Sequence, residues 1–480
     1  MTPTDSSPGV HRKRLLAVLL LPMFMALVAI SVLNVALPAI ENTLHASTTA
    51  LQWTISGYAL MFGLFLVPSG RAGDATGRKR LFMIGVSVFT VGALLSALAS
   101  NSELLIVARL LQGAGSGLLN PQIFGLIQRH FQGQQRATAF AFIGTTVAVA
   151  TAVGPLIGGL LIELFGSELG WRMIFGTNVP LGILAVLAAW RWIPKDRVRT
   201  QTRLDLDPVG TVLLALGILA VMVPFMLRSA PWWVFLLVPI GVGFFLLWGA
   251  WEKRYKRRGR EPMVDMAVLQ QPAFRNGLII ITVYFLGVTS VWILVPLYLI
   301  NHLELTPFQA SLAMLPSSVV AMFSSQLGGR YVLRLGRRMV AAGFALAFLS
   351  LVLVGITAPL VENDTLGWAW FAVPLCLLGF SQGLTIGPNQ TITLSAVDPR
   401  FGGVAGGILS LGQRIGAAVG LALIPGILFS LTQSGTPWLP AFLISLAVIG
   451  ALVLGAFGIT LFDRRREKHD QAAPPEGSAA

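Results

Sequence analysis

The 480-residue sequence contains little charge, one cysteine and only five histidines. Only 11% of its residues are charged and 55% are hydrophobic, whereas about 25% charged is usual in soluble domains, so a soluble fold is excluded. The lone Cys376 excludes an internal disulfide, and the scattered histidines lack the HExxH or CxxC spacing of a metal site. No GxxxxGK loop occurs, so ATP-driven pumping has no support in the sequence.

The sequence consists instead of long apolar runs. A bilayer core about 30 Å thick requires about 20 apolar residues per helix. Fourteen such runs lie between charged or turn-rich stretches, near residues 15–38, 51–70, 81–100, 104–127, 138–165, 173–192, 208–227, 232–251, 276–299, 307–328, 339–358, 368–392, 404–430 and 438–462. We therefore expect an all-α integral membrane protein with 14 transmembrane helices.

The basic residues are distributed unevenly between successive loops. If the N-terminus lies inside the cell, 30 of the 34 Lys and Arg residues fall in cytoplasmic stretches. Because basic residues concentrate in cytoplasmic loops, this predicts a multi-pass protein of the plasma (inner) membrane with both termini in the cytoplasm. The net charge of +14 is then explained by basic loops beside an anionic lipid leaflet, and no nucleic-acid partner is expected.

One stretch of the sequence occurs twice. Residues 70–79, GRAGDATGRK, align with residues 329–338, GRYVLRLGRR. Because duplicated halves are common in helical membrane proteins, we expect two related six-helix bundles, and chance similarity is the alternative for the weaker matches elsewhere. The expected division is an N-terminal tail (1–14), a first bundle (15–192), a linker (193–207), a two-helix insert or hairpin (208–251), a basic linker (252–275), a second bundle (276–462) and a C-terminal tail (463–480).

The first copy of the repeated loop has the residues of a tight turn next to a charged contact. Gly70 and Gly77 permit close approach of helices, and Asp74 can accept hydrogen bonds from an arginine or from a helix N-terminus. Arg78 and Lys79 follow directly. The alternative is a simple basic turn.

The run 104–127 contains an arginine, which is costly in lipid. Arg109 shares one helical stripe with Gly113 and Gly117, and Gln112 lies beside it, so the arginine is expected to point into the bundle. The alternative is an arginine that snorkels to the membrane interface.

The run 138–165 has small residues four apart around a Gly-Pro pair. Ala150, Gly154 and Gly158 allow close helix packing, and Pro155 removes one backbone hydrogen bond. With Gly159, they predict a bendable and tightly packed seam, and a purely packing role is the alternative.

These motifs resemble those of the major facilitator superfamily. The loop 70–79 fits its pattern G-x-x-x-D-x-x-G-R-K/R, the segment from Arg109 fits R-x-x-Q-G, and the Gly-Pro segment fits G-x-x-x-G-P-x-x-G-G with Ala150 replacing the first glycine. With NVALP at 34–38, the sequence is similar over almost its whole length to the fourteen-span drug:proton antiporters, also called drug:H+ antiporter family 2.

The resemblance implies a role for each motif. It implies a conformational latch that helps hold the outward-facing state, formed by Gly70, Asp74, Gly77, Arg78 and Lys79. It links Arg109, with Gln112, to proton movement. It also implies a substrate cavity between the bundles and an antiporter motif that marks exporters, formed by Gly154, Pro155, Gly158 and Gly159.

One position departs from the family pattern. The aspartate that is usual five residues before the Asn of NVALP is replaced here by Ala29. None of the twenty carboxylates lies well inside an apolar run, so proton coupling and a preference for cations are both weakened. Glu41, Glu103 and Glu163, near outer helix ends, remain candidates for proton carriage.

A second arginine lies inside the run 404–430. Arg414, beside Gln413, follows Gly406 and Ser410 at intervals of four, which predicts that it faces the central cavity. Two cavity arginines without a carboxylate favour a neutral or acidic substrate, and the alternative is an arginine bonded to helix carbonyls. Other candidates for the cavity wall are Phe24, Asn34, Trp53, Tyr58, Tyr284 and Phe323.

The sequence therefore predicts a secondary active exporter that works by alternating access. The expected substrates are small amphipathic compounds such as drugs or antibiotics, exchanged for protons, with a proton gradient and no cofactor, and with the monomer as the functional unit. A facilitator or symporter for a lipid or metabolite is the first alternative. A membrane-embedded enzyme is the second, but the sequence shows no clustered acids for a metal and no Ser, His or Cys constellation.

Overall fold

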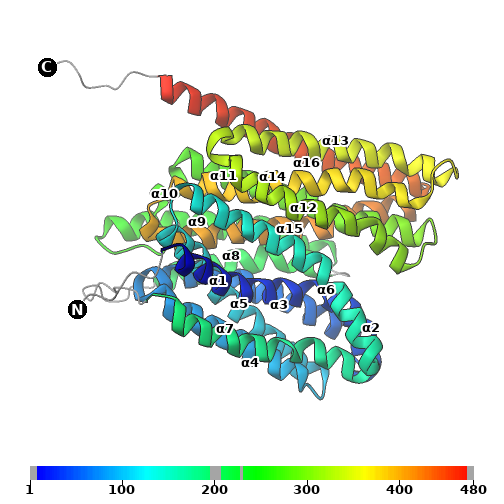
Figure 1. Ribbon diagram of the computed structural model, residues 1–480, viewed down its shortest axis with the longest axis horizontal. Coiled ribbons are helices and arrows are strands. Elements are labelled where there is room, and N and C mark those ends of the chain that lie inside the picture. The colour runs from blue at the N-terminus through cyan, green and yellow to red at the C-terminus, as the bar shows by residue number, and fades with distance from the viewer. Residues whose placement is uncertain (1–7, 195–206, 228–230, 473–480) are drawn as a thin grey trace.

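The computed structural model describes residues 8–194, 207–227 and 231–472, and the regular structure in these ranges is entirely helical (Figure 1). Helices satisfy their backbone hydrogen bonds within one segment, as a lipid environment requires. Twelve helical segments of the described residues are long and apolar enough to cross a membrane. The prediction of an all-α membrane protein is confirmed.

The first group of helices extends from residue 8 to residue 192. It comprises α1 (Pro8–Ser31), α2 (Leu33–Leu44), α3 (Thr48–Thr76), α4 (Arg78–Ala97), α5 (Ser102–His130), α6 (Gly133–Gly176) and α7 (Asn178–Trp192). In this group α5 packs between α3 and α4, and α1 packs against α6 and α7. Helix α6 is broken at Gly166 (φ 76°), a backbone angle that favours glycine. Gly170 packs on the backbone of Ile162, so the chain folds back at this break.

The second group of helices follows residue 265. It comprises α10 (Met266–Gln270), α11 (Pro272–Asn301), α12 (Pro307–Leu335), α13 (Arg337–Glu362), α14 (Ala372–Ser395), α15 (Gly402–Gln433) and α16 (Trp438–Ala472), with the 3-10 turns η2 (Trp368–Phe371) and η3 (Pro399–Phe401). Helix α14 packs against α12 and α13, and α11 packs against α15 and α16. Figure 1 shows this group above the first.

A pair of helices separates the two groups in the sequence. It consists of α8 (Pro208–Met226), η1 (Trp232–Leu236) and α9 (Leu237–Arg257). Asp207 caps α8 by accepting a hydrogen bond from the Gly210 N–H (3.0 Å), and it also accepts one from the Trp251 indole in α9 (2.9 Å). Helix α8 packs on α9 and contacts both α3 and α15, so this pair touches a helix of each group.

Several basic residues, among them Arg12, Arg71 and Arg78, lie at one end of the molecule, which we call the basic end. Helix α1 begins and α16 ends there (Figure 1). At this end Arg12 donates to the Gln135 side chain at the start of α6 (2.6 Å). Arg71, near the end of α3, forms an ion pair with Glu261 in the segment after α9 (2.6 Å).

The two copies of the repeated loop have matching helix boundaries. Gly77 (φ 112°) separates α3 from α4, and Gly336 (φ 51°) separates α12 from α13. Both angles lie in the region that favours glycine. The repeat in the sequence thus corresponds to equivalent turns in the two groups.

Candidate functional site

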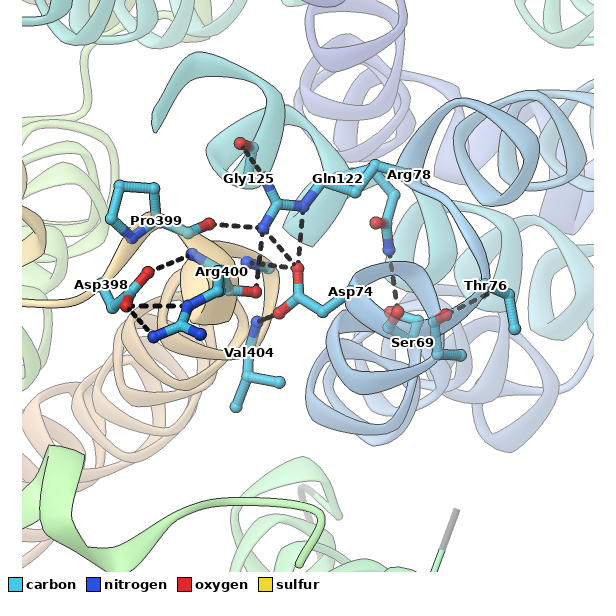
Figure 2. A network of polar contacts seen from close by, with 12 residues as sticks. Ser69, Asp74, Thr76, Arg78, Gln122, Gly125, Asp398, Pro399, Arg400 and Val404 are labelled. Carbon is cyan, nitrogen blue, oxygen red and sulfur yellow. Dashed lines mark hydrogen bonds and ion pairs between the residues drawn. The ribbon is translucent and has the colours of Figure 1, made fainter. Parts of the chain in front are cut away.

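Asp74, in the last turn of α3, links the two groups at the basic end. Its carboxylate accepts hydrogen bonds from the backbone N–H groups of Gly403 (3.1 Å) and Val404 (3.0 Å), at the start of α15 (Figure 2). Unpaired N–H groups and partial positive charge gather at a helix N-terminus. A carboxylate of the first group therefore stabilises a helix end of the second.

Arg78 takes part in the same contact between the two groups. We call this contact of Asp74 and Arg78 with η3 and the start of α15 the joint. The Arg78 guanidinium forms an ion pair with Asp74 (2.7 Å) and donates to the carbonyls of Gly125 in α5 (2.5 Å) and Pro399 in η3 (2.7 Å; Figure 2). The Arg78 and Asp74 side chains are only 5% and 3% exposed. Each charge of such a buried pair depends on the other, because removal of one leaves the second uncompensated.

The other residues of the loop divide into two kinds. A Cβ atom at Gly70 would lie 2.6 Å from the Gly403 carbonyl oxygen, so the close contact between α3 and α15 requires glycine. Gly77 supplies the turn that brings Arg78 to the joint. Lys79 instead donates within the first group, to the carbonyls of Trp190 (2.7 Å) and Ile193 (2.6 Å).

Contacts between the groups continue along α15 from this joint. Ser410 donates to the Asn120 side-chain oxygen in α5 (3.0 Å). The Arg414 guanidinium lies over the Phe62 ring of α3, 4.2 Å from its centre. Arg414 thus faces the first group, and its position in a central cavity stays a prediction.

A second line of contacts joins α6 to α12. Gln134 donates to the Gly329 carbonyl (2.7 Å), and the Gln326 side chain donates to the Thr145 hydroxyl (2.7 Å). Farther from the basic end than Arg414 and Thr145, no hydrogen bond joins the two groups within the part of the chain that the structure describes. The hydrogen bonds between the groups are therefore concentrated toward the basic end.

Arg109 is buried inside the first group, with 1% of its surface exposed. It donates to the carbonyls of Thr54 (3.2 Å) and Ala29 (3.3 Å) and to the Gln112 side-chain oxygen (2.7 Å). The guanidinium also lies over the Tyr58 ring, 4.4 Å from its centre. Arg109 therefore points into the bundle rather than to the interface, and it contacts the backbone of the residue that replaces the family's aspartate.

The Gly-Pro segment packs α6 closely against the junction of α1 and α2. A Cβ atom at Gly154 would collide with the Ser31 hydroxyl, and one at Gly158 would lie 2.7 Å from the Val32 side chain. Pro155 is half-buried, and Gly159 has nothing within 4 Å of the added atom. The four residues therefore have unequal packing roles.

This difference gives a matched pair of variants. We expect Gly158→Ala to destabilise the protein by about 1–3 kcal/mol through overpacking, and Gly159→Ala to have little effect. Thermal unfolding of the detergent-purified variants measures both. Equal melting temperatures for the two variants would contradict the packing role of Gly158.

The carboxylates considered for proton carriage lie apart from Arg109. Glu41, Glu103 and Glu163 are all exposed. Sequence reasoning placed acidic residues only in loops and near helix ends, and it missed that four are buried toward the basic end: Asp74, Asp207, Glu252 and Asp463. Glu252 is 1% exposed, and Trp248 and Trp251, which precede it in α9, are a sequence signal that could have indicated its burial.

The candidates for the cavity wall do not form one cluster. Tyr58 is buried, and its hydroxyl hydrogen-bonds with the Ala26 carbonyl (3.0 Å) and the Ser116 hydroxyl (2.7 Å), inside the first group. Tyr284 packs edge-on against Phe344, inside the second group. Phe24, Gln413 and Arg414 are half-buried, Trp53 and Phe323 are exposed, and the Asn34 side chain lies outside the described residues.

Arg337, the counterpart of Arg78 in the repeat, makes a different set of contacts. It pairs with Asp463 in α16 (2.7 Å) and donates to the Asn389 side chain in α14 (2.6 Å). Asp463 also accepts a hydrogen bond from the Asn276 side chain in α11 (2.7 Å). Leu333 occupies the position that corresponds to Asp74. These contacts of the second copy therefore tie helices of its own group together.

Comparison with known proteins identifies the class of this architecture. The family model described as Major Facilitator Superfamily matches residues 19–421, with a second match over 277–479. The chain belongs to the major facilitator superfamily, whose members are membrane transporters and not enzymes. The resemblance inferred from the loop, arginine and Gly-Pro motifs is confirmed.

Individual relatives are similar over most of the chain. The probable actinorhodin transporter of Streptomyces coelicolor is 32% identical over 442 residues, which are 90% of this chain and 75% of the relative. The multidrug resistance protein Stp of Mycobacterium tuberculosis is 28% identical over 413 residues, 85% of this chain and 74% of the relative. The solved structure of the proton:xylose symporter XylE has the same fold, with a TM-score of 0.66 at 14% identity over 95% of this chain and 96% of that one.

Proposed function

We propose that the protein is a secondary active exporter of small amphipathic compounds, such as drugs or antibiotics, that works by alternating access across the plasma membrane. The observation that carries the proposal is the joint of Asp74 and Arg78 with the start of α15, which holds the two groups together at one end. The names of the actinorhodin and multidrug relatives support export.

The distribution of basic residues orients the molecule in the membrane. We propose that the basic end, where α1 begins and α16 ends, lies in the cytoplasm, because Lys and Arg favour that side. The joint then closes the cytoplasmic side, and the hydrogen bonds concentrated there correspond to an outward-facing state. In this state the substrate leaves, and breakage of the joint is required for return to the inward-facing state.

Fourteen crossings remain our proposal for the chain. Helix α5 is 29 residues long, enough for one crossing. The segment from Gly133 to Trp192 is 60 residues long and folds back near Gly166, so it suffices for two. The proposed division keeps the bundles at 15–192 and 276–462, with the hairpin 208–251 between them. We also propose that a single chain encloses the cavity, so that the monomer is the functional unit.

Proton coupling is proposed to involve Arg109 and Gln112. Arg109 is buried beside Ala29, and its hydrogen-bond acceptors are neutral groups of α1, α3 and α5. These hydrogen bonds depend on the relative positions of the three helices, and none of them involves a carboxylate. Glu41, Glu103 and Glu163 are exposed acids that we propose to lie on the outer side. Because none of them contacts Arg109, an uncoupled facilitator is the second candidate function.

Transport into energised inside-out vesicles tests the proposal. Cationic, neutral and acidic toxic compounds are added in turn while a pH-sensitive dye reports the proton gradient. We expect at least one class to accumulate and to collapse the gradient, unlike in vesicles without the protein. Accumulation with an unchanged gradient would support the facilitator, and no accumulation of any class would refute export.

A further inference from the structure

Among the α15 residues described above as contacting the first group, Arg414 lies farthest from the basic end. It lies 13 residues into the 32-residue helix α15. Its guanidinium covers the Phe62 ring, but it forms no hydrogen bond or ion pair with any residue that the structure describes. Arg109, Arg78 and Arg337, by contrast, each donate to several acceptors.

A second donor beside Arg414 also has no acceptor. The side-chain nitrogen of Gln413 is buried and makes no hydrogen bond within the described residues. Buried donors without an acceptor are rare in proteins, and an ionised side chain at membrane depth is costly unless it serves a site. The two adjacent donors therefore fit an acceptor that a ligand supplies.

The chemistry of the donors selects the class of ligand. A guanidinium binds a carboxylate or sulfonate through two parallel hydrogen bonds and repels a cation. The same face of α15 reaches Leu421 two helical turns farther out, where the side chain is 39% exposed and can contact an apolar body.

We infer that Arg414 and Gln413 form an acid-binding subsite, and that the transported compounds include amphipathic acids whose carboxylate or sulfonate group binds Arg414. This inference rests on the proposed export function and names its substrate class. Arg109 is excluded from direct contact, because its donors are bound inside the first group.

Equilibrium binding to the purified full-length protein in lipid nanodiscs tests the subsite. The probes are anthraquinone-2-carboxylate and its uncharged analogue anthraquinone-2-carboxamide, measured by quenching of protein tryptophan fluorescence. We expect the wild type to bind the acid at least tenfold more tightly than the amide. Arg414→Gln should remove this preference while its amide affinity stays within twofold of wild type, and Arg414→Lys should retain part of the preference.

Two further variants control for folding and for general charge effects. Arg172→Gln removes a cation that donates to the carbonyls of Ala97 (3.2 Å) and Ala99 (2.5 Å) in the first group, and it should keep the full preference. Gln413→Leu should weaken acid binding without loss of amide binding, which tests the subsite even if Arg414→Gln fails to fold.

The inference is overturned if the wild type binds the acid no better than the amide, or if Arg414→Gln keeps the preference. Export of neutral or cationic compounds into vesicles separates this failure from failure of the proposed function. Export without an acid preference would remove the subsite alone. Absence of export for every charge class would remove the exporter as well.

Discussion

Asp74→Asn is expected to lower efflux at least tenfold while folded protein remains in the membrane. The amide keeps one acceptor for the N–H groups of α15 but loses the ion pair with Arg78, which stays buried beside it. Removal of one partner from a buried pair costs about 3–5 kcal/mol. About 1.4 kcal/mol changes an equilibrium tenfold, so the closed basic end loses its advantage over the open one.

Cysteine accessibility measures the conformational part of this effect. Asn120 accepts a hydrogen bond from Ser410 between the two groups and is 7% exposed. In a Cys376→Ser background, a cysteine at this position (Asn120→Cys) therefore reports whether a reagent can enter between the groups from the basic end. Labelling by a charged maleimide should accelerate at least tenfold in Asp74→Asn.

A neighbouring surface ion pair supplies the control. Asp398 pairs with Arg400 (2.7 Å), and their side chains are 41% and 74% exposed (Figure 2). Exposed pairs contribute about 0–1 kcal/mol, so Asp398→Asn should transport and label like the wild type. Equal behaviour of Asp74→Asn and Asp398→Asn would refute the latch.

Arg109→Ala is expected to abolish proton-coupled efflux. The guanidinium joins α1, α3 and α5 through the carbonyls of Ala29 and Thr54 and the Gln112 side chain, and its loss leaves buried acceptors unpaired. Each unpaired buried group costs about 1–3 kcal/mol. Collapse of the proton gradient in inside-out vesicles is the measurement.

Arg109→Lys separates charge from geometry. Lysine keeps the positive charge but cannot donate in three fixed directions. We expect transport to remain strongly reduced, since the acceptors lie on three different helices. Full activity in Arg109→Lys would show that charge alone suffices, and full activity in Arg109→Ala would remove the arginine from the mechanism.

The helical architecture could be predicted because lipid imposes it directly on the sequence, and the family could be predicted because its motifs are short and continuous in the sequence. Apolar runs of bilayer length and the alternation of basic loops are local properties. The loop motif likewise predicts that Asp74 accepts from an arginine or a helix N-terminus, but the sequence does not show which helix. The partners Gly403 and Val404 are more than 300 residues away, and only the packing of the two groups brings them to Asp74.

The faces of individual helices were harder to predict. Helices in this protein are apolar on several sides, so an aromatic residue does not reveal whether it contacts lipid, a cavity or a neighbouring helix. Tyr284 packs inside its own group and Phe323 is 63% exposed, although both lie within runs that are long and apolar enough to cross a membrane. The small residues four apart before Arg414 do mark a face of α15 that contacts the first group, and the predicted position of Arg414 in a central cavity stays a prediction.

The contacts of Arg78 and Arg337 differ although the two arginines occupy equivalent positions. Arg78 donates to the turn before α15, whereas the contacts of Arg337 with Asn389 and Asp463 join α13 to α14 and α16 of the same group. Substitutions in the two copies can therefore alter separate properties. Changes near Asp74 adjust how long the protein remains in one state, and changes near Asp463 adjust whether the second group survives as a rigid unit. The first copy of the loop thus fastens the two groups to each other, while the second copy fastens helices of its own group, so rigidity within a group and attachment between groups depend on different side chains.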